Sequence, residues 1–303
     1  MIGPRQLGRA LAAAPRVLTP LALAAAALAL IVPSGALAAR SDLLLALLVL
    51  ATALGISLTD LRRLRDHAGT VAALSIVPLV VLGAAAWVLG RPFGAPVRDG
   101  LLAVGLASSE VASVGLVALA RADATIALGA VSGSLVASAL IGPLAIGALA
   151  GTATHGGPGP LLGRFALVVI LPLVVGVAVR SRRPQIAAVD PEREGVAALT
   201  VAVLVYAALS GTHGAHHLAS ALLASVAFLA VSAVLAELWR RRADPATAVP
   251  GALAIAMRDF AVAAALATQA FGTGAGAVPG VYGVVMLVAG TVAAGRLARA
   301  AAA

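Results

Sequence analysis

Long apolar runs alternate with short polar connections along the whole chain. Each run is close to the roughly 20 residues that an α-helix needs to cross about 30 Å of hydrocarbon. Hydropathy predicts ten such spans, near residues 15–33, 42–58, 69–89, 98–120, 124–150, 161–180, 194–210, 217–239, 248–271 and 276–297. The pattern therefore predicts an all-α polytopic membrane protein.

The composition agrees with this prediction. Of the 303 residues, 61% are hydrophobic and 11% are charged, whereas an average soluble domain is about 25% charged. The net charge of +9 comes from arginines that lie between the apolar runs, so we do not expect a nucleic acid partner. The chain has no cysteine, which excludes disulfides and thiolate metal sites.

The arginines also predict an orientation in the membrane. If the N-terminus is cytoplasmic, 16 of the 21 arginines fall on the inner side, 4 fall on the outer side, and the last is Arg258 inside a span. By the positive-inside rule we expect a protein of the cytoplasmic membrane with both termini in the cytoplasm. The segment 1–39 also resembles a secretory signal, with three arginines, an apolar stretch and ALAA at 36–39. We favour a retained first helix, because the repeat described next requires it.

Two spans carry an acidic residue inside the apolar run. These residues are Glu110 in LASSEVASVGLVALA and Asp259 in AMRDFAVAAALATQA, and they lie 149 residues apart. Shifting the first five spans by this distance places each on one of the last five. Because five is odd, the halves 1–153 and 154–303 would insert with opposite orientation. We therefore predict two inverted five-helix repeats, a plan found in many secondary transporters.

Both acidic segments have the composition of interrupted helices. GLASSEVAS has two serines and a glutamate in place of leucine, and PGALAIAMRDF concentrates small residues before Arg258 and Asp259. A broken helix is tolerated at membrane depth only where protein or water covers its backbone, and its positive end favours an acid. We expect helices 4 and 9 to be broken and to cross, with Arg258 within reach of Glu110. The alternative is a pair of continuous helices with a buried ion pair.

The same segments resemble the bile acid:sodium symporter family, within the superfamily that includes the arsenite efflux transporters. The similarity is carried by GISLTDLRRL (55–64), SEVASVGLVALARADATIALGAVSGSL (109–135) and AMRDFAVAAALATQAFG (256–272). It implies a core domain of helices 3–5 and 8–10 and a panel domain of helices 1–2 and 6–7. It also implies secondary transport of a small organic anion.

The chain departs from the family at its sodium ligands. Family members place a serine–asparagine pair on the fourth helix, two hydroxyl ligands on the fifth, and a glutamate and a glutamine on the ninth. The corresponding residues here are, in order, Ser113, Val114, Ala127, Val131, Ala254 and Arg258. Four of these positions are aliphatic, so we do not expect sodium coupling at these sites.

The candidate site combines charges with hydroxyl groups near the two interruptions. Arg258 is a fixed cation that rarely gives up its proton, so it could replace a bound ion but not carry a coupling proton. Glu110 and Asp259 can carry one, because two ionised carboxylates around one guanidinium leave a net charge of −1. The alternative is a locked ion-pair network that only holds the crossing together. The candidate substrate and coupling residues are Ser109, Glu110, Ser113, Ser132, Arg258 and Asp259.

Other features change this picture little. His213, His216 and His217 cluster in GTHGAHH without neighbouring carboxylates or cysteines, so we predict a solvated loop and no metal site. Tyr282 lies near a predicted span end and is expected to anchor the membrane interface. The sequence shows no nucleophile–base constellation, so we expect neither an enzyme nor a bound cofactor.

The leading prediction is a secondary transporter that moves a small organic anion across the cytoplasmic membrane, with coupling to protons rather than sodium. Two other classes stay open. One is an uncoupled channel or facilitator, and the other is a signalling or structural membrane protein whose substrate site is inactive. The expected partners are the organic anion, protons and the lipid bilayer.

Overall fold

The computed structural model describes residues 18–38, 40–150, 157–210 and 215–300, and all its named elements are helical. The α-helices are α2 (Leu18–Ile31), α3 (Gly35–Ala38), α4 (Ser41–Ala53), α5 (Leu58–Arg63), α6 (Ala68–Gly90), α7 (Ala95–Leu106), α8 (Ala112–Leu119), α9 (Ala124–Ala150), α10 (Pro158–Phe165), α11 (Leu171–Arg182), α12 (Asp190–Ser210), α13 (Ala215–Arg242), α14 (Pro245–Ala256), α15 (Phe260–Phe271) and α16 (Ala277–Ala300). Shorter turns are η2 (Leu64–His67), η4 (Ala166–Ile170), η5 (Pro184–Val189) and η6 (Thr273–Gly276). The all-α prediction is confirmed.

Six helical stretches in the described ranges are long and apolar enough to cross a membrane. They are Leu58–Gly90, Ala124–Ala150, Pro158–Arg182, Asp190–Ser210, Leu218–Arg242 and Thr273–Ala293. Shorter apolar helices accompany them, among them α2, α4, α14 and α15. Large apolar side chains such as Leu43 and Leu223 are exposed on the outside of the molecule, where a bilayer would cover them. The chain is therefore a multi-pass membrane protein.

The two predicted spans that contain acids, 98–120 and 248–271, are each interrupted. The first is divided into α7 and α8, and the second into α14 and α15. Ala107 and Met257 follow α7 and α14 and have extended backbone, with ψ of 163° and 115°. The predicted interruption of both segments is confirmed, and the alternative of continuous helices is wrong.

The two interrupted segments also correspond in their starting points. Proline lies in the first turn of α7 and of α14, at Pro96 and Pro245, and these positions are 149 residues apart. Proline is tolerated there because the first N–H groups of a helix have no intrahelical acceptor. The packing corresponds as well, since α6 packs on α7 and α9 just as α13 packs on α14 and α16.

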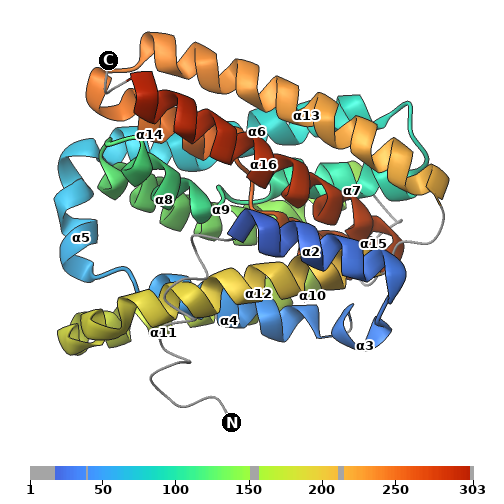
Figure 1. The fold of residues 1–303 in the computed structure, drawn as a ribbon, viewed down its shortest axis with the longest axis horizontal. Coiled ribbons are helices and arrows are strands. Elements are labelled where there is room, and N and C mark those ends of the chain that lie inside the picture. Colours follow the sequence, from blue (N-terminus) through green and yellow to red (C-terminus); the bar gives the residue numbers. More distant parts are fainter. Residues whose placement is uncertain (1–17, 39, 151–156, 211–214, 301–303) are drawn as a thin grey trace.

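The helices pack in two groups (Figure 1). α12 packs on α2 and α4, and α11 packs on α4. The interrupted segments pack instead among α6, α9, α13 and α16. Close approach depends on small residues, as at Gly105, where a Cβ would lie 2.5 Å from the carbonyl oxygen of Leu82. α5, the end of α11 and the C-terminal end of α16 lie at one end of the molecule.

Candidate functional site

The two interruptions are bound to each other through their backbones. The N–H of Glu110 donates to the carbonyl oxygen of Met257 (2.9 Å), and the N–H of Asp259 donates to that of Ser108 (2.8 Å). Between these bonds Ser109 lies opposite Arg258, in a single antiparallel bridge. The crossing thus satisfies backbone groups that broken helices would otherwise leave unpaired at membrane depth.

Alternation along this bridge separates the charged side chains. Successive residues of extended backbone point to opposite faces, and directly opposed residues share a face. Arg258 therefore shares one face with Ser109, whereas Glu110 and Asp259 share the other. The crossing thus has an acidic face and a basic face.

Arg258 is fully buried, and its side chain reaches a backbone carbonyl rather than an acid. Its Nη2 donates to the carbonyl oxygen of Ala107, and its backbone N–H donates to the hydroxyl of Tyr282 (3.1 Å). Among the described residues no ion pair joins Arg258 to Glu110 or Asp259. Arg258 and Glu110 therefore form no direct ion pair, because the extended backbone turns Glu110 to the opposite face of the crossing. A bridge between them through one water stays a prediction.

Each acid precedes a half-helix, but the two carboxyl groups are bound differently. Asp259 caps α15, since its Oδ1 accepts from the N–H groups of Ala261 (2.9 Å) and Val262 (3.0 Å). Oε1 of Glu110 accepts one long bond from the N–H of Ala112 (3.4 Å). Oε2 of Glu110 is buried and has no partner in the described part of the chain. Asp259 therefore has a structural role at its helix end, while Glu110 retains an unused acceptor.

Other buried polar atoms at the crossing also lack a partner among the described residues. They are the hydroxyl groups of Ser108, Ser109 and Ser113, and Nε and Nη1 of Arg258. A buried polar group without a hydrogen bond typically costs about 1–3 kcal/mol, so such groups are uncommon in folded proteins. This cluster is suited to binding a polar solute, a proton or water.

Ser132 is the one predicted site residue that lies away from the crossing. It lies on α9 in a groove that faces α6, and its hydroxyl donates to the carbonyl of Leu128 in its own helix (2.8 Å). The other five predicted residues meet at or directly beside the crossing: Ser109, Glu110, Ser113, Arg258 and Asp259.

Three residues that sequence analysis did not assign to the site hold the crossing in place. Ser134 Oγ accepts from the N–H of Ser109 (2.9 Å), and Ser138 Oγ donates to the carbonyl of Leu106 (2.7 Å). These serines are four residues apart, so they share one face of α9, and that spacing was a usable signal. Tyr282 is fully buried under Arg258, so its predicted place at the membrane interface is wrong.

A cavity of about 470 Å³ extends from Glu110 toward α12. One wall is formed by α2, α4 and α12, and the other by α8 and the start of α9. Small or aliphatic side chains such as Val114 and Ala118 line most of it. Its charged lining residues are Glu110, Asp190, Arg193 and Glu194. The cavity thus joins the crossing to the start of α12.

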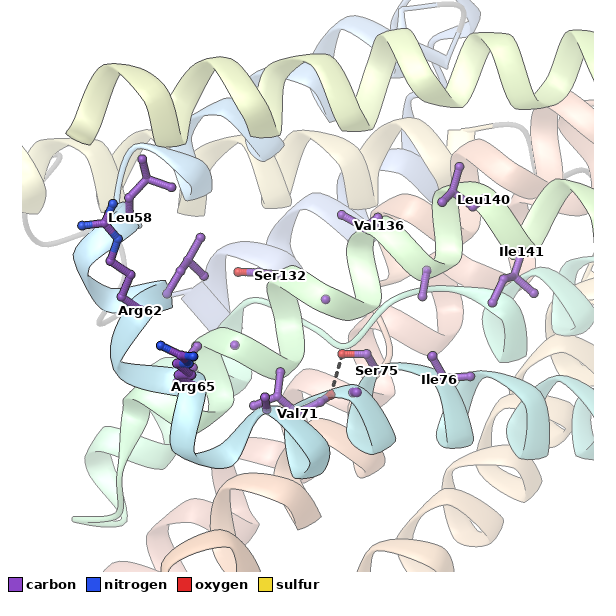
Figure 2. A pocket seen from close by; sticks show the side chains of 17 residues that line it. Leu58, Arg62, Arg65, Val71, Ser75, Ile76, Ser132, Val136, Leu140 and Ile141 are labelled. Atoms are coloured by element: carbon purple, nitrogen blue, oxygen red, sulfur yellow. Dashed lines mark hydrogen bonds between the residues drawn. The ribbon is translucent and has the colours of Figure 1, made fainter. Parts of the chain in front are cut away.

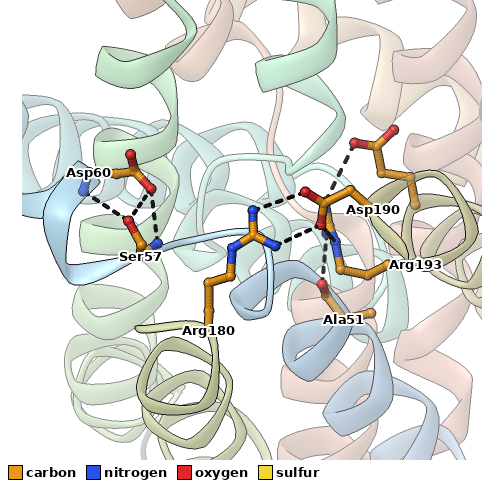
Figure 3. Close-up of polar contacts among 7 residues, drawn as sticks. Ala51, Ser57, Asp60, Arg180, Asp190 and Arg193 are labelled. Atoms are coloured by element: carbon orange, nitrogen blue, oxygen red, sulfur yellow. Dashed lines mark hydrogen bonds and ion pairs between the residues drawn. The ribbon is translucent and has the colours of Figure 1, made fainter. Parts of the chain in front are cut away.

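An ion-pair network lies where the cavity meets the start of α12 (Figure 3). Asp190 accepts from Arg180 (3.1 and 3.0 Å) and from Nε of Arg193 (3.0 Å), and Nη1 of Arg193 donates to the carbonyl of Ala51 (2.8 Å). Gly55 leaves room for this guanidinium, because a Cβ there would lie 2.9 Å from Nη2 of Arg193. The network joins α4, α11 and α12 and fixes an arginine at this end of the cavity.

The opposite end of α4 is tied to α15. The carboxylate of Asp42 accepts from Nε2 of Gln269 (2.6 Å) and from Nε of Arg164 on α10 (2.6 Å). Arg164 and Asp42 also form an ion pair. Asp42 therefore connects an interrupted segment to the α4–α10 side of the molecule, at the end away from Arg193.

The described residues contain no group of three or more metal-binding side chains arranged around a common point. The candidate histidines His213, His216 and His217 lie outside the residues whose side chains are described. His216 and His217 belong to the first turn of α13, so their predicted place in a loop is wrong, whereas the position of His213 and the solvation of all three stay predictions.

Comparison with known families gives a match over almost the whole chain. Residues 17–288 match the SBF-like CPA transporter family. The match includes both interrupted segments and the helices that line the cavity. Comparison with curated proteins finds no match. A family of membrane transporters agrees with the six long apolar helices.

Proposed function

The chain belongs to the SBF-like CPA transporter family, and we propose that it is a secondary transporter of a small organic anion, coupled to protons and not to sodium. The observation that carries the proposal is the buried, incompletely hydrogen-bonded carboxyl group of Glu110. It is 2% exposed, it lines the cavity, and one of its carboxylate oxygens has no partner among the described residues. The anion class rests on the resemblance to bile acid:sodium symporters.

The proposal includes a membrane arrangement of ten crossings in two inverted repeats, 1–153 and 154–303. The shared 149-residue offset of Pro96 and Pro245 supports it, as does the matching packing around α6 and α13. In this arrangement α2, α4, α10–α11 and α12 form the panel, and the remaining spans form the core. The arginines of α5 and of the end of α11 then face the cytoplasm with both termini.

The cavity lies between these two proposed domains and opens toward the cytoplasm at α12. Arg193 is the one arginine among the described lining residues, and its side chain is 15% exposed. Arg193 shares this entrance with Asp190 and Glu194, and small apolar side chains line the path from there to Glu110. A volume of about 470 Å³ lies near the lower end of the range for small-molecule sites, which favours a small substrate.

Glu110 makes movement of an anion dependent on a proton. An ionised carboxylate at the deep end repels an anion, and Asp259 adds negative charge on the same face of the crossing. Protonation of Glu110 removes one charge and adds an O–H donor that can bind the anion. One anion and one proton would therefore move together, and Glu110 would release its proton where the anion leaves.

Arg258 supplies a fixed positive charge at the crossing. Its guanidinium binds a carbonyl just past the C-terminal end of α7, where unpaired carbonyls leave partial negative charge. In many transporters such half-helix ends coordinate a sodium ion. Here Ala127, Val131 and Ala254 are fully buried aliphatic residues that add no side-chain oxygen. This supports a crossing that does not need sodium.

Ligand-induced stabilisation tests the proposal before the substrate is known. The purified protein is heated with a panel of small monocarboxylates and dicarboxylates, at acidic and neutral pH, in sodium or choline salt. We expect at least one anion to raise the unfolding temperature, more at acidic pH, and equally in both salts. A saturable requirement for sodium would contradict the proposal. Flux of the stabilising anion is then measured in proteoliposomes. Flux that depends on no ion gradient would indicate a facilitator, and absence of both binding and flux would indicate an inactive site.

A further inference from the structure

A groove on the outside of the molecule is separate from the crossing and its cavity. Its volume is about 1000 Å³, with α6 and α9 at its sides and the α5–η2 segment at one end. Figure 2 shows Arg62 and Arg65 at this end, and Leu140 and Ile141 at the other. The groove is therefore cationic at one end and apolar at the other.

The wall between these ends offers no open polar group. Ser75 Oγ donates to the carbonyl of Val71 (2.7 Å), and Ser132 Oγ likewise donates within its own helix (2.8 Å). Val136 and Leu140 point into the open side and are 38% and 44% exposed. Such a wall is suited to van der Waals contact with a hydrocarbon chain rather than to a polar solute.

The length of the groove corresponds to one leaflet of a bilayer. On α9 the lining residues extend from Gly129 to Ile141, which is about 18 Å at 1.5 Å per residue. Half of a hydrocarbon core of about 30 Å is roughly 15 Å. The groove therefore matches a single acyl chain that hangs from one membrane surface.

The α5–η2 segment is fixed in position. Ser57 and Asp60 form a reciprocal capping box at the start of α5, with bonds of 3.0 and 3.1 Å. Leu64 is buried against Gly129 of α9, where a Cβ would lie 2.5 Å from Cδ1 of Leu64. Arg62 and Arg65 therefore reach the groove from a segment that the capping box and Leu64 hold in place.

Arg62 and Arg65 have no acidic partner in the described part of the chain. Asp60 is engaged in the capping box, and Asp66, the other acid of this segment, does not line the groove. Two guanidinium groups at the end of an apolar groove can bind phosphate oxygens through paired N–H donors. Arg63 is exposed on the same helix but does not line the groove.

We propose that this groove binds an anionic phospholipid, with its phosphate on Arg62 and Arg65 and one acyl chain along α9. A second cavity of about 500 Å³, between α9 and α11, shares Ser132, Gly133 and Val136 with the groove. The bound chain therefore lies beside the seam between α9 and α11. The site is defined by binding alone and does not depend on the proposed transport activity.

Retention of lipid by the purified full chain tests this site. The protein is incubated with phosphatidylglycerol or phosphatidylcholine of identical acyl chains, and bound lipid is measured by native mass spectrometry. We expect preferential retention of phosphatidylglycerol. The variant Arg62→Ala/Arg65→Ala should reduce this preference roughly 30-fold, the ratio expected for two arginines near a membrane surface. Arg63→Ala, a loss of one charge from the same helix, should leave the preference unchanged.

A second pair of variants tests the apolar part of the groove. Val136→Trp should fill the groove and lower retention of phosphatidylglycerol, whereas Leu223→Trp, at an exposed position of α13, should not. If Val136→Trp does not fold, Leu140→Trp tests the same wall. Equal retention of both lipids by the wild type would overturn the proposal. So would an undiminished preference in Arg62→Ala/Arg65→Ala, or an equal loss in Arg63→Ala.

Discussion

Arg258 donates a hydrogen bond to the carbonyl oxygen of Ala107, which lies 151 residues earlier in the chain and directly follows α7. The last carbonyls of a helix have no amide donor of their own, and a cation is favoured beside them. A full charge inside an apolar run thus has a partner in the backbone. Arg258 makes no direct contact with either acid, and Glu110, which caps no helix, stays available for proton chemistry.

This contact predicts how variants of Arg258 behave. Arg258→Met keeps much of the side-chain volume but removes the donor to Ala107, and a hydrogen bond from a charged group contributes about 1.5–3 kcal/mol. We expect the free energy of unfolding to fall by about this amount, with a lower midpoint in thermal unfolding. Arg258→Lys should lose less, since it keeps a cation.

The same variants test for a direct pair with Glu110. Arg258 and Glu110 lie in one crossing but form no ion pair, so Glu110→Gln should not recover the stability that Arg258→Met loses. If Glu110→Gln instead restored the stability of Arg258→Met, the two side chains would have to interact directly, and the described geometry of the crossing would be contradicted.

The capping role of Asp259 predicts a difference between two substitutions. Asp259→Ala removes the acceptor for the N–H groups of Ala261 and Val262 and should lower stability by about 0.5–2 kcal/mol. Asp259→Asn keeps a side-chain oxygen and should be close to the wild type in thermal unfolding. Equal losses in both variants would show that the charge of Asp259, and not its cap, stabilises the fold.

Sequence patterns were sufficient to predict the all-helical fold and the interruption of two of its helices. Serines with Glu110, and Arg258 with Asp259, are too polar for a continuous membrane helix, and this predicted both breaks correctly. The pairing of the charges was not predictable from helical spacing, because the helical rotation of about 100° per residue does not apply to the extended backbone at the crossing.

Other positions depended on tertiary contacts that hydropathy does not encode. Tyr282 is a tyrosine near a predicted span end, which is typical of an interfacial anchor. Its hydroxyl instead accepts from the N–H of Arg258 inside the core. Ser132 lies on the same helix as Ser134 and Ser138, yet only the latter two face the crossing. Which face of α9 turns inward is decided by packing, not by residue type.

The proposed orientation predicts the labelling of single cysteines, which the cysteine-free chain makes specific. Gln185→Cys and Ala246→Cys, at exposed positions, should react with an impermeant thiol reagent only after the cells are permeabilised. Ala95→Cys, at the start of α7, should react in intact cells. The reverse pattern would contradict the cytoplasmic placement of both termini.

The hydrogen bond between Asp42 and Gln269 joins α4 to α15, and we predict that it must break during transport. It ties α15 to α4 at the end away from the Arg193 network. If the two proposed domains move apart there, a disulfide in Asp42→Cys/Gln269→Cys should abolish uptake, and a reductant should restore it. Asp42→Cys alone serves as the control. Undiminished uptake by the cross-linked protein would show that α4 and α15 stay together.

Proton entry driven by an anion tests the central claim, that Glu110 carries a proton with the substrate, most directly. Liposomes with wild-type protein, an internal pH-sensitive dye and choline as the only added cation receive an anion that stabilises the protein. Protein-free liposomes measure passive entry. We predict internal acidification with wild type and with Glu237→Gln, a surface change on α13. With Glu110→Gln we predict none, although it should still exchange labelled anion. Acidification that requires sodium, or that persists in Glu110→Gln, would contradict the account.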